Sequence, residues 1–374
     1  MKKNLLILNY EFPPLGGGAG NATYYFLKEL AKYPDVEVDL VTSSVGKFRI
    51  EKFAGNVDIH YLDIKKKGNL HVQSNIDLLN YSRKAYFYSK QLMKVKKYHV
   101  CHAFFGIPCG YIAMKLKIPY IVSLRGSDVP FYNKRYWFLD RFFFQRLSKT
   151  IWENAKEVVA NSGGLRDLAL ESYSGREIRV IPNGVDVGEF ALKKKSMKKK
   201  GEKIKIVSVG RLIPRKGYEY LIKALKGKEN FELTLIGDGD LLTELKNLAK
   251  KMNVKVYFSG RVKHEDIADV LQEKDIFVLP SLNEGMSNAI LEAMACGLPI
   301  VATDTGGSKE LVKKNGFLVE KRSVNELKEV LEKFEKEPNL ILEMGYISRE
   351  IAEQMNWGNI VKKYLDLYEQ IIHE

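Results

Sequence analysis

Two acidic residues, Glu284 and Glu292, lie eight positions apart where an apolar run gives way to a helical pattern. The apolar run ends at Pro280, a polar glycine-containing loop follows, and a helix is predicted over Ser287–Cys296. Helix N-termini bind phosphate because their first N–H groups have no partner within the helix and the helix dipole is positive there. Carboxylates accept hydrogen bonds from hydroxyl groups. The segment therefore predicts a site for a ligand that carries hydroxyls and a diphosphate.

A structural interpretation of the same segment competes with this one: Ser287 caps a helix, and Glu284 is a surface acid. It is weaker for Glu292, whose predicted helix otherwise contains mainly Ala, Ile, Leu and Met. An acid among apolar side chains usually needs a partner.

A second segment places Arg211 and Lys216 in a loop that follows another apolar run ending at Gly210. Cations at this position can stabilise the charge of a leaving diphosphate, and one well-placed donor contributes about 3–4 kcal/mol. A basic surface loop is the alternative, and Arg215 is compatible with a solvated position.

A third segment, 16–20, is rich in glycine and follows the first apolar run. Glycine lets the backbone pass close to a ligand. The spacing is not that of the dinucleotide fingerprint, and the acid that the fingerprint requires after the second strand is missing. By itself this loop is weak evidence for any ligand.

These segments must be positioned by an alternation of strands and helices, which is typical of parallel sheets. The predicted strands of the first half are 5–9, 36–42, 58–62, 100–103, 120–124, 157–160 and 178–181, with helices at 23–32, 77–96 and 139–155. In the second half the predicted strands are 204–209, 232–236, 255–259, 276–279, 299–302 and 316–319, with helices at 218–225, 240–251, 265–272, 287–296 and 324–336.

The alternation indicates an α/β protein with two doubly wound parallel-sheet domains. We expect an N-terminal domain over 1–190, a basic linker over 191–203, a C-terminal domain over 204–345, and a final helical segment over 346–374 that packs back towards the N-terminal domain. Because ligands bind at the carboxyl ends of parallel strands, the predicted site is a central cleft between the domains.

The composition fits a cytoplasmic enzyme. The chain has 374 residues, of which 45% are hydrophobic and 28% charged. No apolar run approaches the roughly 18 residues that suggest a membrane span. The three cysteines are irregularly spaced, which argues against a disulfide framework or a zinc cluster.

The net charge of +14 is concentrated in the first half. Residues 1–186 hold 28 Lys and Arg against 17 Asp and Glu, whereas residues 201–374 hold 26 against 28. The excess of positive charge in the first half is explained equally well by a requirement for solubility and by an anionic partner. Nucleic acid is disfavoured as the partner, because acidic residues are interspersed with the basic ones and the sequence contains no recognisable nucleic-acid-binding module. The aromatic and basic stretch 131–147 predicts either peripheral contact with an anionic membrane or a core-facing aromatic stripe.

The assembled pattern resembles the retaining GT-B glycosyltransferases of family 4 over almost the whole chain. The matching segments, in the order of that family, are the glycines at 16–18, the Ser-Leu-Arg-Gly-Ser-Asp run at 123–128, the Pro-Asn-Gly run at 182–184, Gly210 and Arg211 with Lys216, the Gly-Asp-Gly run at 237–239, and Glu284 with Glu292. The last pair, in its Pro-Ser, Glu-Gly and Cys-Gly context, is the most specific of them.

The resemblance implies a role for each matching residue. Arg211 and Lys216 would hold the donor diphosphate, Glu284 the donor sugar and Glu292 the ribose. Lining or approaching the donor are Gly17, Gly18, Gly210, Asp238, Ser281, Asn283, Gly285, Met286 and Ser287, with Arg261 and Val262 at the base. His102, Arg125 and Asp128 would face the acceptor. The family often has histidines at positions 104 and 125, where this chain has Phe104 and Arg125.

The function expected from this resemblance is transfer of a hexose-type sugar from a UDP- or GDP-sugar to a glycan or lipid-linked acceptor, with retention of anomeric configuration. The implied catalytic residues are Arg211, Lys216, Glu284, His102 and Asp128. No cofactor and no metal are expected, since no Asp-x-Asp cluster suited to a divalent ion is evident. A sugar-nucleotide epimerase or a phosphorylase on the same two-domain plan is the alternative.

Overall fold

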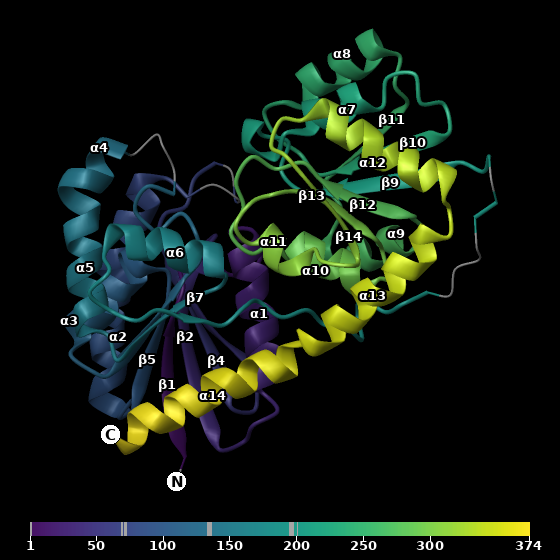
Figure 1. Ribbon diagram of the computed structural model, residues 1–374. Helices are drawn as coiled ribbons and strands as arrows, with labels where there is room; N and C mark the ends of the chain where they lie inside the picture. The colour runs from purple at the N-terminus through teal and green to yellow at the C-terminus, as the bar shows by residue number, and fades with distance from the viewer. Residues whose placement is uncertain (1, 69, 71–72, 133–136, 194–197, 200) are drawn as a thin grey trace. The chain divides into compact units, whose positions relative to one another are not determined.

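The computed structural model describes residues 2–68, 70, 73–132, 137–193, 198–199 and 201–374 (Figure 1). The chain forms two compact units. Unit 1 comprises Met1–Asn183 and Trp357–Glu374, and unit 2 comprises Gly184–Asn356. The predicted cleft between the domains stays a prediction.

Among the described residues, unit 1 contains one sheet with the strand order β3-β4-β2-β1-β5-β6-β7-β8. All neighbouring strands are parallel except β3 and β4. The strands are β1 (Lys3–Leu8), β2 (Val36–Ser44), β3 (Arg49–Ala54), β4 (Val57–Asp63), β5 (Val100–Phe104), β6 (Tyr120–Leu124), β7 (Glu157–Ala160) and β8 (Arg179–Val180). The central strands are buried on both faces, which explains why they are apolar nearly throughout.

Helices cover both faces of this sheet, as right-handed crossovers require. On one face α3 packs against both α2 and α5, and on the other α1 packs against α14 (Figure 1). The helical segments of unit 1 are α1 (Gly18–Leu30), α2 (Asn75–Val95), η1 (Gly106–Gly110), α3 (Tyr111–Leu116), α4 (Trp137–Leu139), η3 (Asp140–Phe144), α5 (Gln145–Asn154), α6 (Gly163–Ser172) and α14 (Trp357–His373).

The described part of unit 2 forms a wholly parallel sheet with the order β11-β10-β9-β12-β13-β14. Its strands are β9 (Ile204–Val209), β10 (Phe231–Ile236), β11 (Val256–Gly260), β12 (Ile276–Leu279), β13 (Ile300–Thr303) and β14 (Gly316–Val319). Its helical segments are η4 (Pro214–Lys216), α7 (Tyr218–Ala224), α8 (Leu242–Met252), η5 (His264–Asp266), α9 (Ile267–Gln272), α10 (Asn288–Ala295), α11 (Ser308–Leu311), α12 (Val324–Lys336) and α13 (Leu340–Gln354).

Three features differ from the sequence-based expectation. Strand β3 was not predicted, because it is an antiparallel edge strand whose residues are mostly exposed and lack an apolar pattern. The predicted final segment over 346–374 contains the end of α13, which belongs to unit 2, and all of α14, which belongs to unit 1. The predicted linker over 191–203 lies within unit 2, and its residues 194–197 and 200 are outside the described residues.

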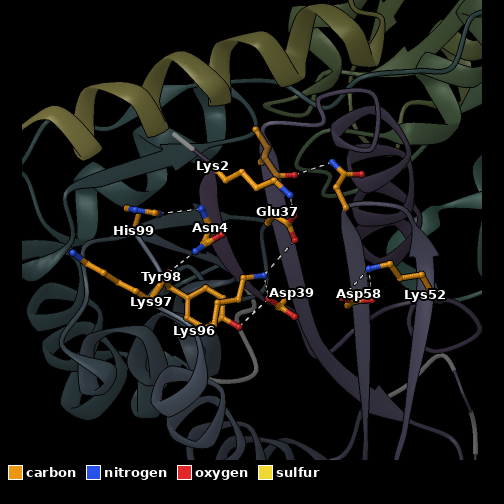
Figure 2. A network of polar contacts seen from close by, with 12 residues as sticks. Lys2, Asn4, Glu37, Asp39, Lys52, Asp58, Lys96, Lys97, Tyr98 and His99 are labelled. Carbon is orange, nitrogen blue, oxygen red and sulfur yellow. Dashed lines mark hydrogen bonds and ion pairs between the residues drawn. The ribbon is translucent and has the colours of Figure 1, made fainter.

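A buried acid stabilises the amino-terminal half of β2 in unit 1 (Figure 2). The Asp39 carboxylate accepts hydrogen bonds from His60 Nε2 at 2.7 Å, Lys96 Nζ at 2.7 Å and Tyr98 Oη at 2.9 Å. Burial opposes ionisation of Asp39, but these three donors outweigh it and lower its pKa to about 2. The network therefore joins β2 and β4 to the end of α2 through one charged group.

None of the helices described here is long and apolar enough to cross a membrane.

Candidate active site

The strand order of unit 2 identifies where a ligand should bind. After β9 the chain builds the sheet towards β11, and after β12 it builds towards β14, so these two neighbours flank the point where the order reverses. Ligands of doubly wound sheets bind at the carboxyl ends of the strands at this switch point. The loop after β9 carries Gly210, Arg211 and Lys216, and the loop after β12 carries Ser281 and residues 283–287.

Two glycines allow the loops at this edge to pack backbone against backbone. Gly217 has φ +64°, and a Cβ there would lie 2.2 Å from the carbonyl oxygen of Pro280. A Cβ on Gly307, in the loop after β13, would lie 1.5 Å from the carbonyl oxygen of Gly285. Real Cβ atoms do not approach so closely, so these positions require glycine. The glycines thus bring the loops after β9, β12 and β13 together around the switch point.

Lys216 and Glu284 meet across the switch point. Lys216 Nζ lies 2.5 Å from Glu284 Oε1, and the side chains are 11% and 9% exposed. Ser281 Oγ donates to the same carboxylate oxygen at 2.8 Å. Burial would raise the pKa of Glu284, but the charges of Lys216 and Arg215 and the hydrogen bonds from Lys216 and Ser281 lower it. The site therefore holds a buried carboxylate in its ionised form.

Arg215 takes a larger part in this site than the sequence suggested. It is half-buried, its charge acts on Glu284, and its carbonyl oxygen accepts from the Leu282 N–H at 2.8 Å. Gly210 is also close, since a Cβ there would lie 3.1 Å from Lys216 Cε. The missed signal is the single-turn segment η4, which turns both Arg215 and Lys216 towards the loop after β12.

Helix α10 begins beside this ion pair. Its N-cap is Ser287, whose Oγ accepts from the Ile290 N–H at 3.4 Å. Gly285, Met286 and Ser287 are buried, and Asn283 is half-buried. The predicted helix thus begins at its predicted cap, close to the loop that carries Glu284.

Glu292 lies one turn into α10 and differs from Glu284 in its electrostatics. Burial raises the pKa of Glu292, and the charge of Glu189 raises it further, whereas His264 acts in the opposite direction. His264 Nε2 lies 3.7 Å from Glu292 Oε1, and the His264 ring packs on Phe190 with centroids 5.7 Å apart. His264 was not predicted as a site residue, because nothing in its local sequence pattern indicates that the loop after β11 reaches α10.

The remaining predicted donor residues of unit 2 are at the same edge of the sheet. Arg211 is exposed in the loop after β9. Asp238 is exposed after β10, where its carboxylate accepts from the Gly239 N–H at 2.8 Å and its carbonyl oxygen accepts from the Leu212 N–H at 2.9 Å. Arg261 is exposed and Val262 half-buried after β11. Their contact with a donor stays a prediction.

In unit 1 the glycine-rich loop lies at the corresponding switch point, between β1 and β5. Gly17 and Gly18 are exposed at the start of α1, and the Gly17 N–H donates to Glu11 Oε2 at 3.3 Å. The loop is therefore accessible, as a ligand-approaching loop must be, although its predicted contact with the donor stays a prediction.

Asp128 accepts hydrogen bonds from the backbone of its own loop and of the segment that follows β5. Its carboxylate accepts from the N–H groups of Gly106 at 2.7 Å and of Arg125 and Gly126 at 2.9 Å each. Burial raises the pKa of Asp128 although these N–H groups lower it. It is 9% exposed and organises the backbone after β6. Contact with an acceptor stays a prediction.

His102, which the resemblance places on the acceptor side, lies in the core of unit 1. It is fully buried, with Nδ1 2.5 Å from Tyr368 Oη and Nε2 2.7 Å from Ser123 Oγ. Burial, helped by the charge of Arg125, lowers the pKa of His102 well below its usual value, so the ring is neutral. The ring joins β5 to α14, because Tyr368 belongs to that helix. A catalytic role for His102 stays a prediction.

The two departures from the family pattern contact each other. The Arg125 guanidinium lies over the Phe104 ring at 4.5 Å, and Arg125 Nη1 donates to Asn183 Oδ1 at 2.6 Å. The His102 ring also stacks on Phe104, with the ring centroids 4.3 Å apart. An arginine needs an aromatic face or an acceptor when it is buried, and Phe104 and Asn183 provide both.

Within the described ranges, no group of three or more His, Cys, Asp or Glu side chains is arranged to hold a metal ion. Independence from metal stays a prediction.

Two family models match consecutive parts of the chain. The model described as Glycosyltransferase Family 4 matches residues 16–189, and the model described as Glycosyl transferases group 1 matches residues 189–351. A glycosyltransferase of Methanocaldococcus jannaschii is 29% identical over 374 residues, which is 98% of each chain.

Two relatives of lower coverage have names that state their substrates. UDP-Gal:alpha-D-GlcNAc-diphosphoundecaprenol alpha-1,3-galactosyltransferase of Escherichia coli is 34% identical over 52% of this chain and 55% of that protein. GDP-mannose-dependent monoacylated alpha-(1-6)-phosphatidylinositol monomannoside mannosyltransferase of Corynebacterium glutamicum is 32% identical over 47% of this chain and 52% of that protein.

Solved structures show the same fold at low sequence identity. Sucrose-phosphate synthase from Thermosynechococcus elongatus has a TM-score of 0.85 at 21% identity and covers 100% of both chains. The Anabaena protein HepE in complex with UDP and glucose has a TM-score of 0.74 at 20% identity, over 98% of this chain and 99% of that one.

The two parallel-sheet units and these matches define a glycosyltransferase with the GT-B fold. Within that class the chain is of the family 4 type, since the two models together span residues 16–351.

Proposed function

We propose that this glycosyltransferase moves a hexose-type sugar from a UDP- or GDP-sugar to a glycan or lipid-linked acceptor, with retention of anomeric configuration and without a metal ion. The observation that carries the proposal is the Lys216–Glu284 ion pair at the switch point of unit 2, beside the N-terminus of α10. This arrangement offers a cation, helix N–H groups and an ionised acid to one ligand. A sugar joined to a diphosphate needs all three.

Lys216 can serve the diphosphate and Glu284 at the same time. An ammonium group has three N–H donors, and the contact with Glu284 Oε1 uses one of them. As the bond between the anomeric carbon and the diphosphate oxygen breaks, negative charge grows on that oxygen. Lys216, Arg211 and the α10 N-terminus would stabilise it. Glu284 would accept hydrogen bonds from the hydroxyls of the sugar.

In the proposed reaction an acceptor hydroxyl oxygen bonds to the anomeric carbon while the diphosphate leaves. The acceptor proton passes to the leaving phosphate oxygen, so that a nucleoside diphosphate and a glycoside are the products. Attack from the face that the diphosphate leaves accounts for retention. A lipid-linked acceptor is supported by the names of the Escherichia coli and Corynebacterium glutamicum relatives, which include a diphosphoundecaprenol and a phosphatidylinositol mannoside.

The direct test is a donor screen that measures release of UDP or GDP with and without lipid extract, followed by NMR of the glycosidic product. We expect one nucleotide sugar to be consumed only when acceptor is added, with the anomeric configuration kept and with EDTA leaving the rate unchanged. An inverted product would refute retention, and loss of activity in EDTA that returns with Mg²⁺ would refute metal independence.

A further inference from the structure

Unit 1 carries a dense group of exposed apolar side chains at the start of the helix that follows β6. Within the seven positions 137–143, five large apolar side chains are exposed: Trp137 at 43%, Phe138 at 73%, Leu139 at 54%, Phe142 at 67% and Phe143 at 58%. They belong to α4 and η3, which lead into α5. The sequence left open whether the aromatic stripe in this stretch faces the core. The exposure of these five side chains shows that they do not.

Basic residues share the same face and continue along it. Arg141, Arg146 and Lys149 are exposed, and the Arg141 guanidinium lies over the Trp137 ring at 5.6 Å. Positions 138, 142 and 149, and positions 139, 143 and 146, follow helical spacing, so each row runs from two apolar side chains to a basic one. We call residues 137–139, 141–143, 146 and 149 the aromatic–basic surface.

The acid within this segment does not oppose the positive charge on the surface. Asp140 is buried, and its carboxylate accepts from the Phe131 N–H at 2.9 Å. The next acid along the chain is Glu153, 3.9 Å from Lys149 Nζ at the far end of α5. The aromatic–basic surface is therefore cationic at the positions where its aromatic side chains are exposed.

We propose that the aromatic–basic surface docks on the surface of an anionic lipid bilayer. Exposed Trp and Phe insert at the boundary between headgroups and acyl chains, and adjoining Arg and Lys pair with anionic headgroups. A nucleic acid would pair with the basic side chains but would leave Phe138, Phe142 and Phe143 in water. An anionic lipid surface accounts for both the exposed aromatic side chains and the basic side chains, and we therefore propose it as the binding partner.

The position of this surface in unit 1 suits a lipid-linked acceptor. The loop 125–132 follows β6 and contains Arg125 and Asp128, and residues 133–136 after it lie outside the described residues. Asp140 fastens the end of that loop to η3 through the Phe131 N–H. The aromatic–basic surface is thus attached to the loop predicted to face the acceptor. The docking proposal itself does not need the proposed reaction, because binding to vesicles is measured without any sugar donor.

The chain contains its own reporter for this test. Of its three tryptophans, Trp152 and Trp357 are buried in unit 1, and Trp137 is exposed. With vesicles of phosphatidylcholine and 30 mol% phosphatidylglycerol, we expect the tryptophan emission to shift to the blue and brominated lipid to quench it. The variant Trp137→Phe should lose the shift yet still co-sediment. A shift that persists in Trp137→Phe would contradict insertion at this surface.

Two variants separate the apolar and the basic contributions. Phe138→Ser/Phe142→Ser/Phe143→Ser and Arg141→Glu/Arg146→Glu should each weaken vesicle binding by about tenfold or more. Matched controls in unit 2 are Tyr257→Ser/Tyr346→Ser, which removes exposed aromatics, and Lys246→Glu/Lys250→Glu, which reverses exposed charges on α8. Both controls should bind vesicles like the unchanged chain. All variants replace exposed side chains, so unchanged thermal unfolding checks that each one folds.

Lipid charge and salt complete the test. We expect binding to fall by about tenfold when phosphatidylglycerol is omitted, and to fall again in 0.5 M salt at about a 4 Å Debye length. Equal binding to neutral and anionic vesicles would overturn the proposal. So would unchanged vesicle binding in both surface variants, or retention on single-stranded RNA that equals retention on anionic vesicles.

Discussion

Lys216 Nζ and Glu284 Oε1 lie 2.5 Å apart, although 68 residues separate them in the chain. The contact joins the loops that follow β9 and β12, the strands that flank the switch point of unit 2. It fixes a cation where a diphosphate would bind and keeps an acid ionised where sugar hydroxyls would bind. Because both side chains are about nine-tenths buried, removing either one leaves the other as an unpaired buried charge.

Replacing Lys216 with alanine should abolish most of the transferase activity. Loss of one preorganised cation at a leaving diphosphate is expected to lower kcat by about 100- to 1000-fold. The same change removes a charge that lowers the pKa of Glu284, so that pKa should rise. Steady-state release of nucleoside diphosphate measures the first effect, and NMR titration of the carboxyl group measures the second. Lys223→Ala, an exposed lysine of α7, is the matched control. A Lys216→Ala variant with unimpaired turnover would contradict the proposed role.

Glu292→Gln should separate stability from donor binding. Burial raises the pKa of Glu292, so ionising it costs more in the folded chain than in the unfolded chain. This unfavourable contribution appears as the pH rises through the carboxyl pKa of the unfolded chain. The variant should therefore be at least as stable as the original chain at pH 7, while the donor KM rises about tenfold or more because an acceptor for the ribose hydroxyls is weakened.

Urea unfolding at pH 7 and pH 4 and a donor titration test both halves of this prediction. The exposed neighbour Glu265 supplies the control Glu265→Gln, which should change neither quantity. A marked loss of stability at pH 7 in Glu292→Gln would mean that the carboxylate is needed for the fold, and the ribose role would then lose its support.

Asp39 should account for part of the acid sensitivity of unit 1. The pKa of Asp39 is lowered from 3.8 to about 2, so the ionised carboxylate stabilises the folded chain at any pH above the unfolded value. That shift corresponds to about 2 kcal/mol at pH 7, and this contribution is lost as the pH falls from about 4 to about 2. Asp39→Asn should lower the free energy of unfolding at pH 7 by at least this amount.

The nearby pair of Asp58 and Lys52 is the internal control, because Asp58 is 32% and Lys52 56% exposed (Figure 2). Exposed ion pairs contribute about 0–1 kcal/mol, so Asp58→Asn should have little effect. Urea unfolding between pH 2 and pH 7 compares the two variants. If both variants lost the same free energy of unfolding, the burial of Asp39 would not make its ion pair more stabilising than the exposed one.

Periodicity predicted most of the fold, since the buried strands of both units are apolar runs whose ends are marked by glycine, proline or polar residues. The exposed edge strand β3 has no such signal and could not be predicted. The pairing of Lys216 with Glu284 follows from the strand order, and local patterns do not reveal which strands are neighbours. Strand order was therefore the information that the sequence analysis lacked.

Local sequence patterns also could not predict which residues are buried inside a unit or which distant residues they contact. His102 follows an apolar run and precedes Phe104, a pattern equally compatible with a loop-edge ligand and a core residue. The structure makes it a core residue because α14, from the far end of the chain, supplies Tyr368 as a hydrogen-bond partner. His264 was not predicted because its contact is also distant in the sequence. It follows β11, whereas its neighbour Glu292 belongs to α10.

Gly307 gives the sharpest test of how the loops of unit 2 are held together. A Cβ at this position would lie 1.5 Å from the Gly285 carbonyl oxygen, so Gly307→Ala must push the loop after β13 away from the loop after β12. Overpacking of this kind typically costs about 1–3 kcal/mol. Because Gly285 follows Glu284 directly, the displacement should also disturb the acid that faces Lys216, and activity should fall more than tenfold even at temperatures where the variant stays folded.

Gly55→Ala is the matched control, because a Cβ on Gly55 would meet nothing within 4 Å. Thermal unfolding and nucleoside diphosphate release at 15 °C below the unfolding midpoint compare the two variants. If Gly307→Ala kept full activity at that temperature, the backbone contact between the two loops would have no part in forming the donor site. The donor residues would then have to be positioned by the ion pair and the α10 cap alone.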